Sequence, residues 1–140
     1  MKKVYLASPF FSDTQNERVE MMEKLLRSRG LDVFSPRENQ LKGLEFGSKD
    51  WRDAVFANDV TNIHKADLVV AIYDEEDAGT MWELGWACAN RIPCIVFNES
   101  EKVMNLMITD SLHAYLGSRE ELEAYDFDKM PRSRYEGEMI

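Results

Sequence analysis

The chain has 140 residues, a length that fits one domain with a sizeable core, so we expect residues 1–140 to form a single domain. Its net charge of −9 and its pI near 4.7 argue against a nucleic acid partner, because binding to a phosphate backbone needs clustered Lys and Arg. There is no signal-peptide pattern and no apolar run near the roughly 18 residues of a membrane span, so we expect a cytoplasmic protein with no membrane partner. These features favour a small-molecule substrate.

The first half of the chain alternates strand and helix patterns. Short apolar runs predict strands over residues 4–7 and 31–35. Between them, Ser12 gives a cap signal and is followed by apolar residues at helical spacing. Residues 36–48 form a polar loop whose length is typical of a functional or mobile segment, and residues 51–65 predict a second helix.

The second half continues the alternation. Residues 67–73 give the clearest central strand, and an acidic loop then leads into an apolar helix over residues 81–89. Residues 93–97 predict a fourth strand. Beyond it, residues 103–116 are compatible with helical or mixed structure, and residues 120–125 predict a short acidic helix.

Strands that alternate with helices predict an α/β fold, in which a parallel sheet carries helices on both faces. In such a sheet, ligands bind beyond the carboxyl ends of the strands. Residues 8–11, 35–43, 74–83 and those from Asn98 onward follow the four predicted strands. The polar residues of the chain therefore cluster where this fold places a site.

The two cysteines, Cys88 and Cys94, both lie in apolar stretches. Neither has a metal-binding spacing with His64 or His113. We therefore predict that both are core thiols, and the sequence predicts no metal site.

Glu83 is the residue that most needs an explanation. An ionised carboxylate in an apolar helix is unfavourable unless it has partners or a task. Thr80 stands three residues before it, the spacing of a capping box. Alternatively, with Asp77 just upstream, a carboxylate near a helix N-terminus is held ionised by the helix dipole, as a nucleophile needs to be. The sequence leaves both a cap and a catalyst open.

The absence of other motifs narrows the chemistry. The chain has no glycine-rich dinucleotide fingerprint, no P-loop and no G-x-S-x-G nucleophile elbow. A carboxylate nucleophile remains, of the kind that forms covalent intermediates at anomeric carbons.

Several side chains suit this chemistry, although each has a plainer interpretation. Asp59 and Asp77 offer a proton donor and a ligand for a sugar hydroxyl, but Asp59 also fits a solvated helix face. Gln40 and Asn105 offer amides, and Gln40 also fits an ordinary loop. Tyr5 lies either in the core or beneath the site, according to strand alternation.

The aromatic residues are more typical of core packing than of ligand binding. Trp82 and Trp86 lie in the apolar helix, where core packing is the simpler interpretation. Phe10 and Phe11 fit the core too, but their loop position also allows them to stack on a base.

Five segments together resemble the nucleoside 2-deoxyribosyltransferases, in family order and over nearly the whole chain. They are YLASPFF (5–11), SPRENQ (35–40), FAND (56–59), DEEDAGTMWELG (74–85) and MNLM (104–107). The short G-x-x-x-E element within the fourth segment also occurs in deoxynucleotide N-glycosidases, whereas the complete set is quite specific.

The resemblance implies a flavodoxin-like (Rossmann-like) domain that exchanges bases on 2'-deoxyribose by a retaining ping-pong reaction, in nucleotide salvage. It implies that Glu83 attacks C1' to give a covalent deoxyribosyl-enzyme, that Tyr5 orients Glu83, and that Asp59 is the best proton-donor candidate. The implied partners are 2'-deoxynucleosides and free nucleobases, and no metal or cofactor is implied.

The resemblance also implies the substrate contacts. Asp77 is expected to hold a sugar hydroxyl and Gln40 to contact the base, which Phe10 is positioned to stack on. Asn105 is expected to reach the sugar of a neighbouring subunit's substrate, with Met107 beside it. A homo-oligomer is therefore implied, with a hexamer favoured.

One departure and two alternatives accompany this interpretation. Several family members end in a tyrosine that folds into the site, whereas this chain ends in Ile140, which leaves the role of the terminus open. One alternative is a deoxynucleoside 5'-monophosphate N-glycosidase, but Ser8 and Ser12 near the first loop have no adjacent arginine for a phosphate. The other is a non-catalytic nucleoside-binding module. Within the family, residues 35–40 and 74–83 favour the broad class that accepts purines and pyrimidines.

Overall fold

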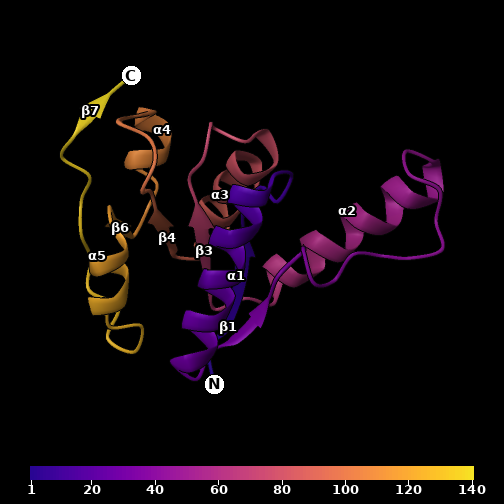
Figure 1. Cartoon of the computed structure of the whole chain (residues 1–140), viewed down its shortest axis with the longest axis horizontal. Helices are drawn as coiled ribbons and strands as arrows, with labels where there is room; N and C mark the ends of the chain where they lie inside the picture. The colour runs from indigo at the N-terminus through magenta and orange to yellow at the C-terminus, as the bar shows by residue number, and fades with distance from the viewer.

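The computed structural model describes residues 1–140 and contains a five-stranded sheet in the order β2-β1-β3-β4-β6 (Figure 1). The strands are β1 (Lys3–Ala7), β2 (Asp32–Phe34), β3 (Leu68–Ile72), β4 (Cys94–Phe97) and β6 (Ala114–Leu116). Every neighbouring pair runs parallel, and β3 is buried along its whole length. This is the strand order of flavodoxin-like folds, so the predicted α/β architecture is confirmed.

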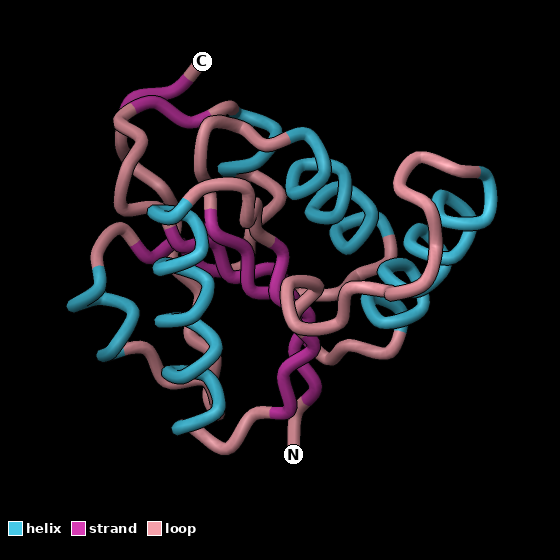
Figure 2. The backbone as a smooth tube through the Cα atoms, turned by 45° about the vertical axis from the view of Figure 1, so that its right-hand side comes forward, coloured by secondary structure: helices cyan, strands magenta, loops and turns pink.

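Helices cover both faces of the sheet, as predicted (Figure 2). α1 (Asp13–Ser28) and α5 (Arg119–Ala124) pack on one face, and α2 (Lys49–His64), α3 (Ala78–Ala89) and α4 (Leu106–Thr109) pack on the other. Along β1 the side chains alternate between the two faces. Val4 and Leu6 therefore join the core under α1, whereas Tyr5 and Ala7 join the core under α3.

The predicted first helix is confirmed by α1. The hydroxyl of Ser12 caps it and accepts a hydrogen bond from the Gln15 amide at 3.2 Å. Its buried apolar residues, Val19, Met22 and Leu26, recur at helical spacing. Its N-terminal turn therefore lies at the carboxyl end of β1, where the fold places ligands.

The second predicted helix begins two residues earlier than expected, at Lys49, because the Ser48 hydroxyl caps it and accepts from the Trp51 amide at 3.1 Å. Only Ile63, near its C-terminal end, is fully buried. α2 therefore projects away from the sheet over most of its length (Figure 1).

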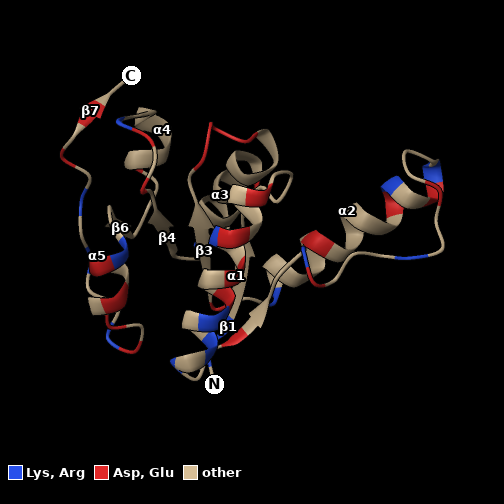
Figure 3. Ribbon diagram, viewed as in Figure 1, with Lys and Arg blue, Asp and Glu red and all other residues tan.

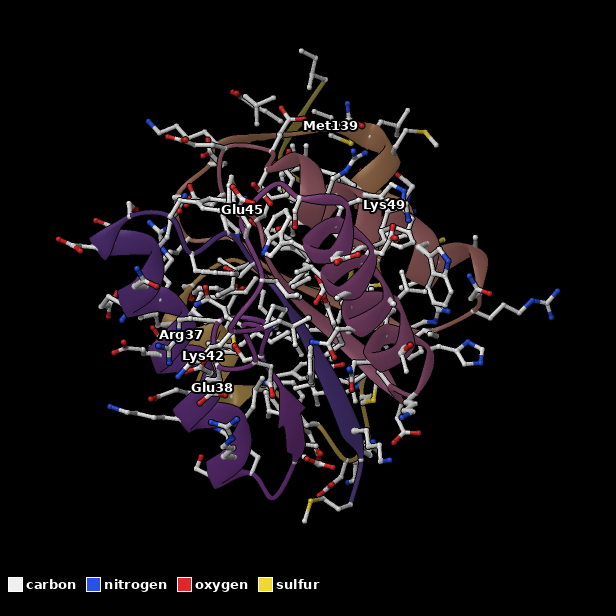
Figure 4. All side chains as sticks on the ribbon, turned by 90° about the vertical axis from the view of Figure 1, so that its right-hand side faces the viewer. Arg37, Glu38, Lys42, Glu45, Lys49 and Met139 are labelled. Carbon is white, nitrogen blue, oxygen red and sulfur yellow. The ribbon has the colours of Figure 1, made fainter.

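The segment that connects β2 to α2 is fixed at its start. Glu23 on α1 is only 3% exposed and accepts hydrogen bonds from the Ser35 hydroxyl and from the Arg37 guanidinium. Figure 4 shows Arg37 beside α1, whereas Glu45 and Lys49 lie farther along, toward the start of α2. A buried ion pair thus anchors the base of a loop that is otherwise exposed to solvent.

Residues 103–116 contain mixed structure: β5 (Val103–Met104), α4 and the fifth strand of the main sheet, β6. β5 pairs with β7 (Glu138–Met139), which comes from the C-terminal tail. The amide of Leu106 donates to the carbonyl oxygen of Ile140 at 2.9 Å. The end of the described chain therefore lies beside Asn105.

Two expectations about the apolar helix were wrong. α3 begins at Ala78 rather than at residue 81, and it buries only Thr80, Leu84 and Ala87, because one face alone packs on the sheet. Cys88 lies on the uncovered face and is exposed, whereas Cys94 is buried in β4 as predicted. No helix combines the length and the apolar character that crossing a bilayer requires.

Candidate active site

Tyr5 and Glu83 form the centre of the site. Tyr5 is fully buried on β1, and its hydroxyl donates a hydrogen bond to Oε2 of Glu83, which projects from the second turn of α3. The ring of Phe34 stacks against that of Tyr5 with a centroid separation of 5.6 Å. The tyrosine is therefore held from two sides and fixes one oxygen of the carboxylate.

Burial governs the protonation of this pair. The pKa of Glu83 is raised to about 8 in total: desolvation is the main cause, the Tyr5 hydrogen bond opposes it, and the nearby carboxylates of Asp59 and Asp77 add to it. Burial and the charges of Glu83 and Asp59 raise the pKa of Tyr5 far above its usual range. Tyr5 consequently stays an O–H donor at all working pH values.

Asp59 lies close enough to influence both groups electrostatically. It projects from α2, is partly buried, and has a pKa raised to about 6 by desolvation. The solvated-face interpretation of Asp59 is therefore wrong. A carboxyl group with a pKa near neutrality suits proton transfer.

The capping-box interpretation of Glu83 is also wrong. Asp77 caps α3, and its Oδ2 accepts from the amide of Thr80 at 3.0 Å and from the Thr80 hydroxyl at 2.8 Å. Thr80 therefore lies inside the helix, and Glu83 lies too far along it for the positive end of the dipole to keep it ionised. Desolvation outweighs the dipole, which reverses the shift expected from the sequence.

A cavity of about 650 Å³ adjoins the site between the start of α1 and the loop that leads into α3. Asp77 and Phe11 line it, whereas Tyr5 and Glu83 do not. The rest of its lining is polar and includes three carboxylates and one cation: Ser12, Thr14, Gln15, Arg18, Asp74, Glu75, Ser100 and Glu101. Asp77 therefore lines this polar cavity and is also near enough to Glu83 to raise the pKa of that carboxyl group.

The remaining predicted residues make local contacts, and none of them bonds to Tyr5 or Glu83. Gln40 is exposed, and its Nε2 donates to the carbonyl oxygen of Arg37 at 3.0 Å. Phe10 stacks on Phe11 and packs partly against the core under α1. Asn105 caps α4 through a 2.8 Å bond from the Met107 amide to its Oδ1.

Phe10 and Trp86 pack partly against the core as expected, whereas the other two aromatic residues are exposed. Phe11 is 79% exposed and Trp82 is 47% exposed. The ring of Trp82 meets that of Phe56 on α2 edge to face, with a centroid separation of 5.5 Å. These rings border the surface where α2 and α3 come together, on the same face of the sheet as Tyr5.

No group of three or more His, Cys, Asp and Glu side chains has the arrangement of a metal site. The site therefore consists of two carboxyl groups with raised pKa values, one tyrosine and a capping aspartate. In chemical terms it offers a nucleophile, an orienting hydrogen-bond donor and a proton donor.

Comparison with known proteins decides the family. The family model described as nucleoside 2-deoxyribosyltransferase matches residues 4–127. The chain belongs to this family. Membership makes it a transferase, and the matched region contains Tyr5, Asp59 and Glu83.

Individual nucleoside deoxyribosyltransferases are similar over most of their length. The one from Lactobacillus leichmannii is 29% identical over 155 aligned positions, which cover 97% of this chain and 96% of that protein. The one from Limosilactobacillus fermentum is 28% identical, with 90% of this chain and 85% of that protein covered.

Solved structures agree with this assignment. The 2-deoxyribosyltransferase from the psychrotolerant bacterium Bacillus psychrosaccharolyticus superposes with a TM-score of 0.90 at 47% identity, covering 95% of this chain and 98% of that one. A conserved protein from Enterococcus faecalis V583 shares the fold at a TM-score of 0.61 and 21% identity.

Two features of this nucleoside 2-deoxyribosyltransferase family member were missed by sequence reasoning. Phe34 backs Tyr5, and strand register was the available signal, since the two residues pair across β1 and β2. Arg18 and Gln15 bind Asp74, which sequence spacing alone does not indicate because 56 and 59 residues separate the partners.

Proposed function

We propose that the protein transfers a 2-deoxyribosyl group between purine and pyrimidine bases through a covalent deoxyribosyl-Glu83 intermediate. The observation that carries the proposal is the partly buried, desolvated Glu83 carboxyl group with its Tyr5 hydrogen bond. A desolvated carboxylate is a strong nucleophile once ionised, because little water competes for its charge.

In the first half-reaction, a Glu83 oxygen bonds to C1' while the C1'–N bond breaks and its electron pair stays with the base. Asp59 supplies the proton that the departing base takes up. In the second half-reaction, a nitrogen of the incoming base bonds to C1', the Glu83–C1' bond breaks with its electron pair left on Glu83, and the incoming base gives its N–H proton to Asp59. Two inversions give net retention.

The pKa values favour a protonated Glu83 and an ionised Asp59 near neutral pH, so the proposed division of roles uses a minor form of the free enzyme. Asp59, with a pKa of about 6, is close to the value that suits a proton donor and acceptor near neutral pH. Tyr5 keeps its proton and therefore always donates to Glu83, which lowers the pKa of that carboxyl group. Its bond also restricts the rotation of the carboxylate, which favours one line of attack.

We further propose that Asp77 binds a sugar hydroxyl. Both of its hydrogen bonds within the chain go to Oδ2, which leaves Oδ1 available. Gln40 is proposed to contact the base, with Phe10 providing an aromatic surface at the margin. Purines and pyrimidines are both accepted in this proposal, because residues 35–40 and 74–83 resemble the class of the family that accepts both.

A homo-oligomer, with a hexamer favoured, is proposed to complete the site through Asn105 of a neighbouring subunit. Exposed apolar side chains support it, since they surround Asn105: Val103, Leu106, Met107, Met139 and Ile140. An exposed apolar patch of this kind favours a protein interface. Met107, which is 74% exposed, is proposed to lie against the neighbour's site.

A deoxynucleoside 5'-monophosphate is a less suitable substrate. The cavity next to Asp77 contains the carboxylates of Asp74, Glu75 and Glu101, which repel a phosphate dianion. Arg18 is its one cation and is already paired with Asp74 and Glu99. A mere binding module is also disfavoured, because a buried carboxyl group with a raised pKa is unfavourable without a chemical task.

Base exchange tests the proposal. The pure protein is incubated with thymidine and adenine, and separately with deoxyinosine and adenine, and the products are separated by liquid chromatography. Deoxyadenosine from both donors is expected, and deoxyadenosine from deoxyinosine alone would contradict broad specificity. Free deoxyribose without deoxyadenosine, or no turnover with either donor, would contradict transfer.

A further inference from the structure

The loop between β3 and α3 has a conformation that needs support from its surroundings. Glu75 and Glu76 have φ angles of 52° and 48°, in the left-handed region that disfavours residues with a side chain. Figure 3 shows this loop as a continuous acidic stretch. Two consecutive strained residues with like charges persist only where neighbouring contacts hold them.

α1 holds the start of this loop. Asp74 is 8% exposed, and its Oδ2 accepts from Nε2 of Gln15 and from Nη1 of Arg18, both at 3.0 Å. Nε of Arg18 donates to Glu99 at 2.9 Å, so the guanidinium is itself fixed on a second side. The pair is largely shielded from water, which strengthens it relative to a surface ion pair.

The turn transmits the position of Asp74 to Asp77. The carbonyl oxygen of Asp74 accepts from the Asp77 amide at 3.2 Å, which closes the turn. On its outer side, the Glu75 amide donates to Glu101 at 3.0 Å. Because Asp77 caps α3 through Oδ2, the direction of its Oδ1 depends on where this turn is held.

We propose that Arg18, assisted by Gln15, is a positioning residue for Asp77. Its bond to Asp74 keeps the strained turn in place and thereby directs the free Asp77 oxygen at a sugar hydroxyl. This inference rests on the proposed function. Direct binding of a substrate anion by Arg18 is a poorer explanation. Its Nη1 is already paired with Asp74 and its Nε with Glu99.

The test compares substrates that differ by one hydroxyl. kcat/KM for base exchange is measured with a 2'-deoxynucleoside and with its 3'-deoxy and 5'-deoxy analogues, and Asp77→Ala identifies the hydroxyl that Asp77 binds. Arg18→Met is expected to lower kcat/KM about 10- to 100-fold with the parent nucleoside, the loss for a hydrogen bond to a charged group. With the analogue that lacks this hydroxyl, the loss is expected to be less than about threefold.

Arg119→Met is the matched control. Arg119 also binds Glu99, and it binds Glu17, but it does not touch Asp74. Its removal is expected to leave kcat/KM unchanged with every substrate. Arg18→Lys is expected to recover part of the lost activity, because it keeps a cation beside Asp74.

If Arg18→Met lowers kcat/KM equally with the parent nucleoside and with the analogue that lacks the hydroxyl bound by Asp77, the proposal is overturned. Equal losses would indicate a general structural role for Arg18. An unchanged kcat/KM in Arg18→Met would overturn it too, as would an Asp77→Ala effect that is independent of both hydroxyls. If Arg18→Met does not fold, Gln15→Ala, which removes the neutral donor to Asp74, is tested by the same criterion. Failure of the wild-type protein to exchange bases would instead refute the proposed function, and this inference with it.

Discussion

Replacement of Asp59 by Asn is predicted to reverse the dependence of activity on pH in alkaline solution. The pKa values of about 8 for Glu83 and about 6 for Asp59 mean that a single shared proton rests mainly on Glu83. The reactive form needs the opposite arrangement, with Glu83 ionised and Asp59 protonated. The reactive form is therefore a minor part of the singly protonated free enzyme.

The plot of wild-type kcat/KM against pH is therefore expected to be bell-shaped, with apparent pKa values near 6 and 8. These values describe the Asp59–Glu83 pair as a whole. In Asp59→Asn only Glu83 titrates, and its pKa falls because the neighbouring negative charge is gone. Activity is then expected to rise with pH and level off, without an alkaline limb. At neutral pH, losing the acid lowers the rate about 10²- to 10⁴-fold, and the larger ionised fraction of Glu83 restores roughly tenfold.

The assay measures initial rates of exchange at low substrate concentration between about pH 5 and pH 10, because kcat/KM reports the free enzyme. Asp53 is exposed and lies on α2 before Asp59, so Asp53→Asn is the control and is expected to keep the bell-shaped profile. A persistent alkaline limb in Asp59→Asn would refute the reasoning, since another group would then supply the proton.

Three further predictions concern the same site. Tyr5→Phe removes the bond that lowers the pKa of Glu83, so kcat/KM at neutral pH is expected to fall about 10- to 100-fold with the fold intact by circular dichroism. Burial raises the pKa of Glu83 in the folded protein from its ordinary 4.5 to about 8. The folded state therefore has its full stability below pH 4.5, where Glu83 is protonated in both states, and loses part of it as pH rises through about 8. Glu83→Gln is therefore expected to exceed the wild type by a few kcal/mol in urea unfolding near pH 9 and to match it near pH 4, whereas equal stability near pH 9 would contradict the desolvation argument. Co-expressed Glu83→Ala and Asn105→Ala subunits are expected to regain exchange that neither variant has alone, and no recovery would contradict a shared site.

The sequence was sufficient for most of the fold because the local patterns agree with the tertiary structure. The continuous apolar run of β3 could only be a buried strand, and the cap at Ser12 and the helical spacing after it located α1. β6 was missed because its three residues are too short to show a period. β5 pairs with β7 in the C-terminal tail, more than 30 residues later in the sequence. No local pattern encodes a contact at that separation.

Within the site, the sequence indicated which residues lie together better than it indicated their protonation. The expected contact between Tyr5 and Glu83 is present, whereas their roles stay predictions and the pKa shift of Glu83 was predicted with the wrong sign. The reason is that burial depends on what α2 and the sheet place over α3, whereas the dipole is a property of the helix alone. Competition between Asp77 and Thr80 for the cap, and the exposure of Cys88, likewise depend on packing that the sequence does not show.

The most direct test of the account is to trap the glycosyl-enzyme. A 2'-fluoro-substituted deoxynucleoside slows breakdown of such an intermediate, because fluorine destabilises the oxocarbenium-like transition state. Intact-protein mass spectrometry is expected to show the mass of one fluorodeoxyribosyl group per chain, which peptide fragmentation assigns to Glu83, with no label in Glu83→Gln. Label on another residue, or base exchange by Glu83→Gln at the wild-type rate, would contradict the assignment of Glu83 as the nucleophile.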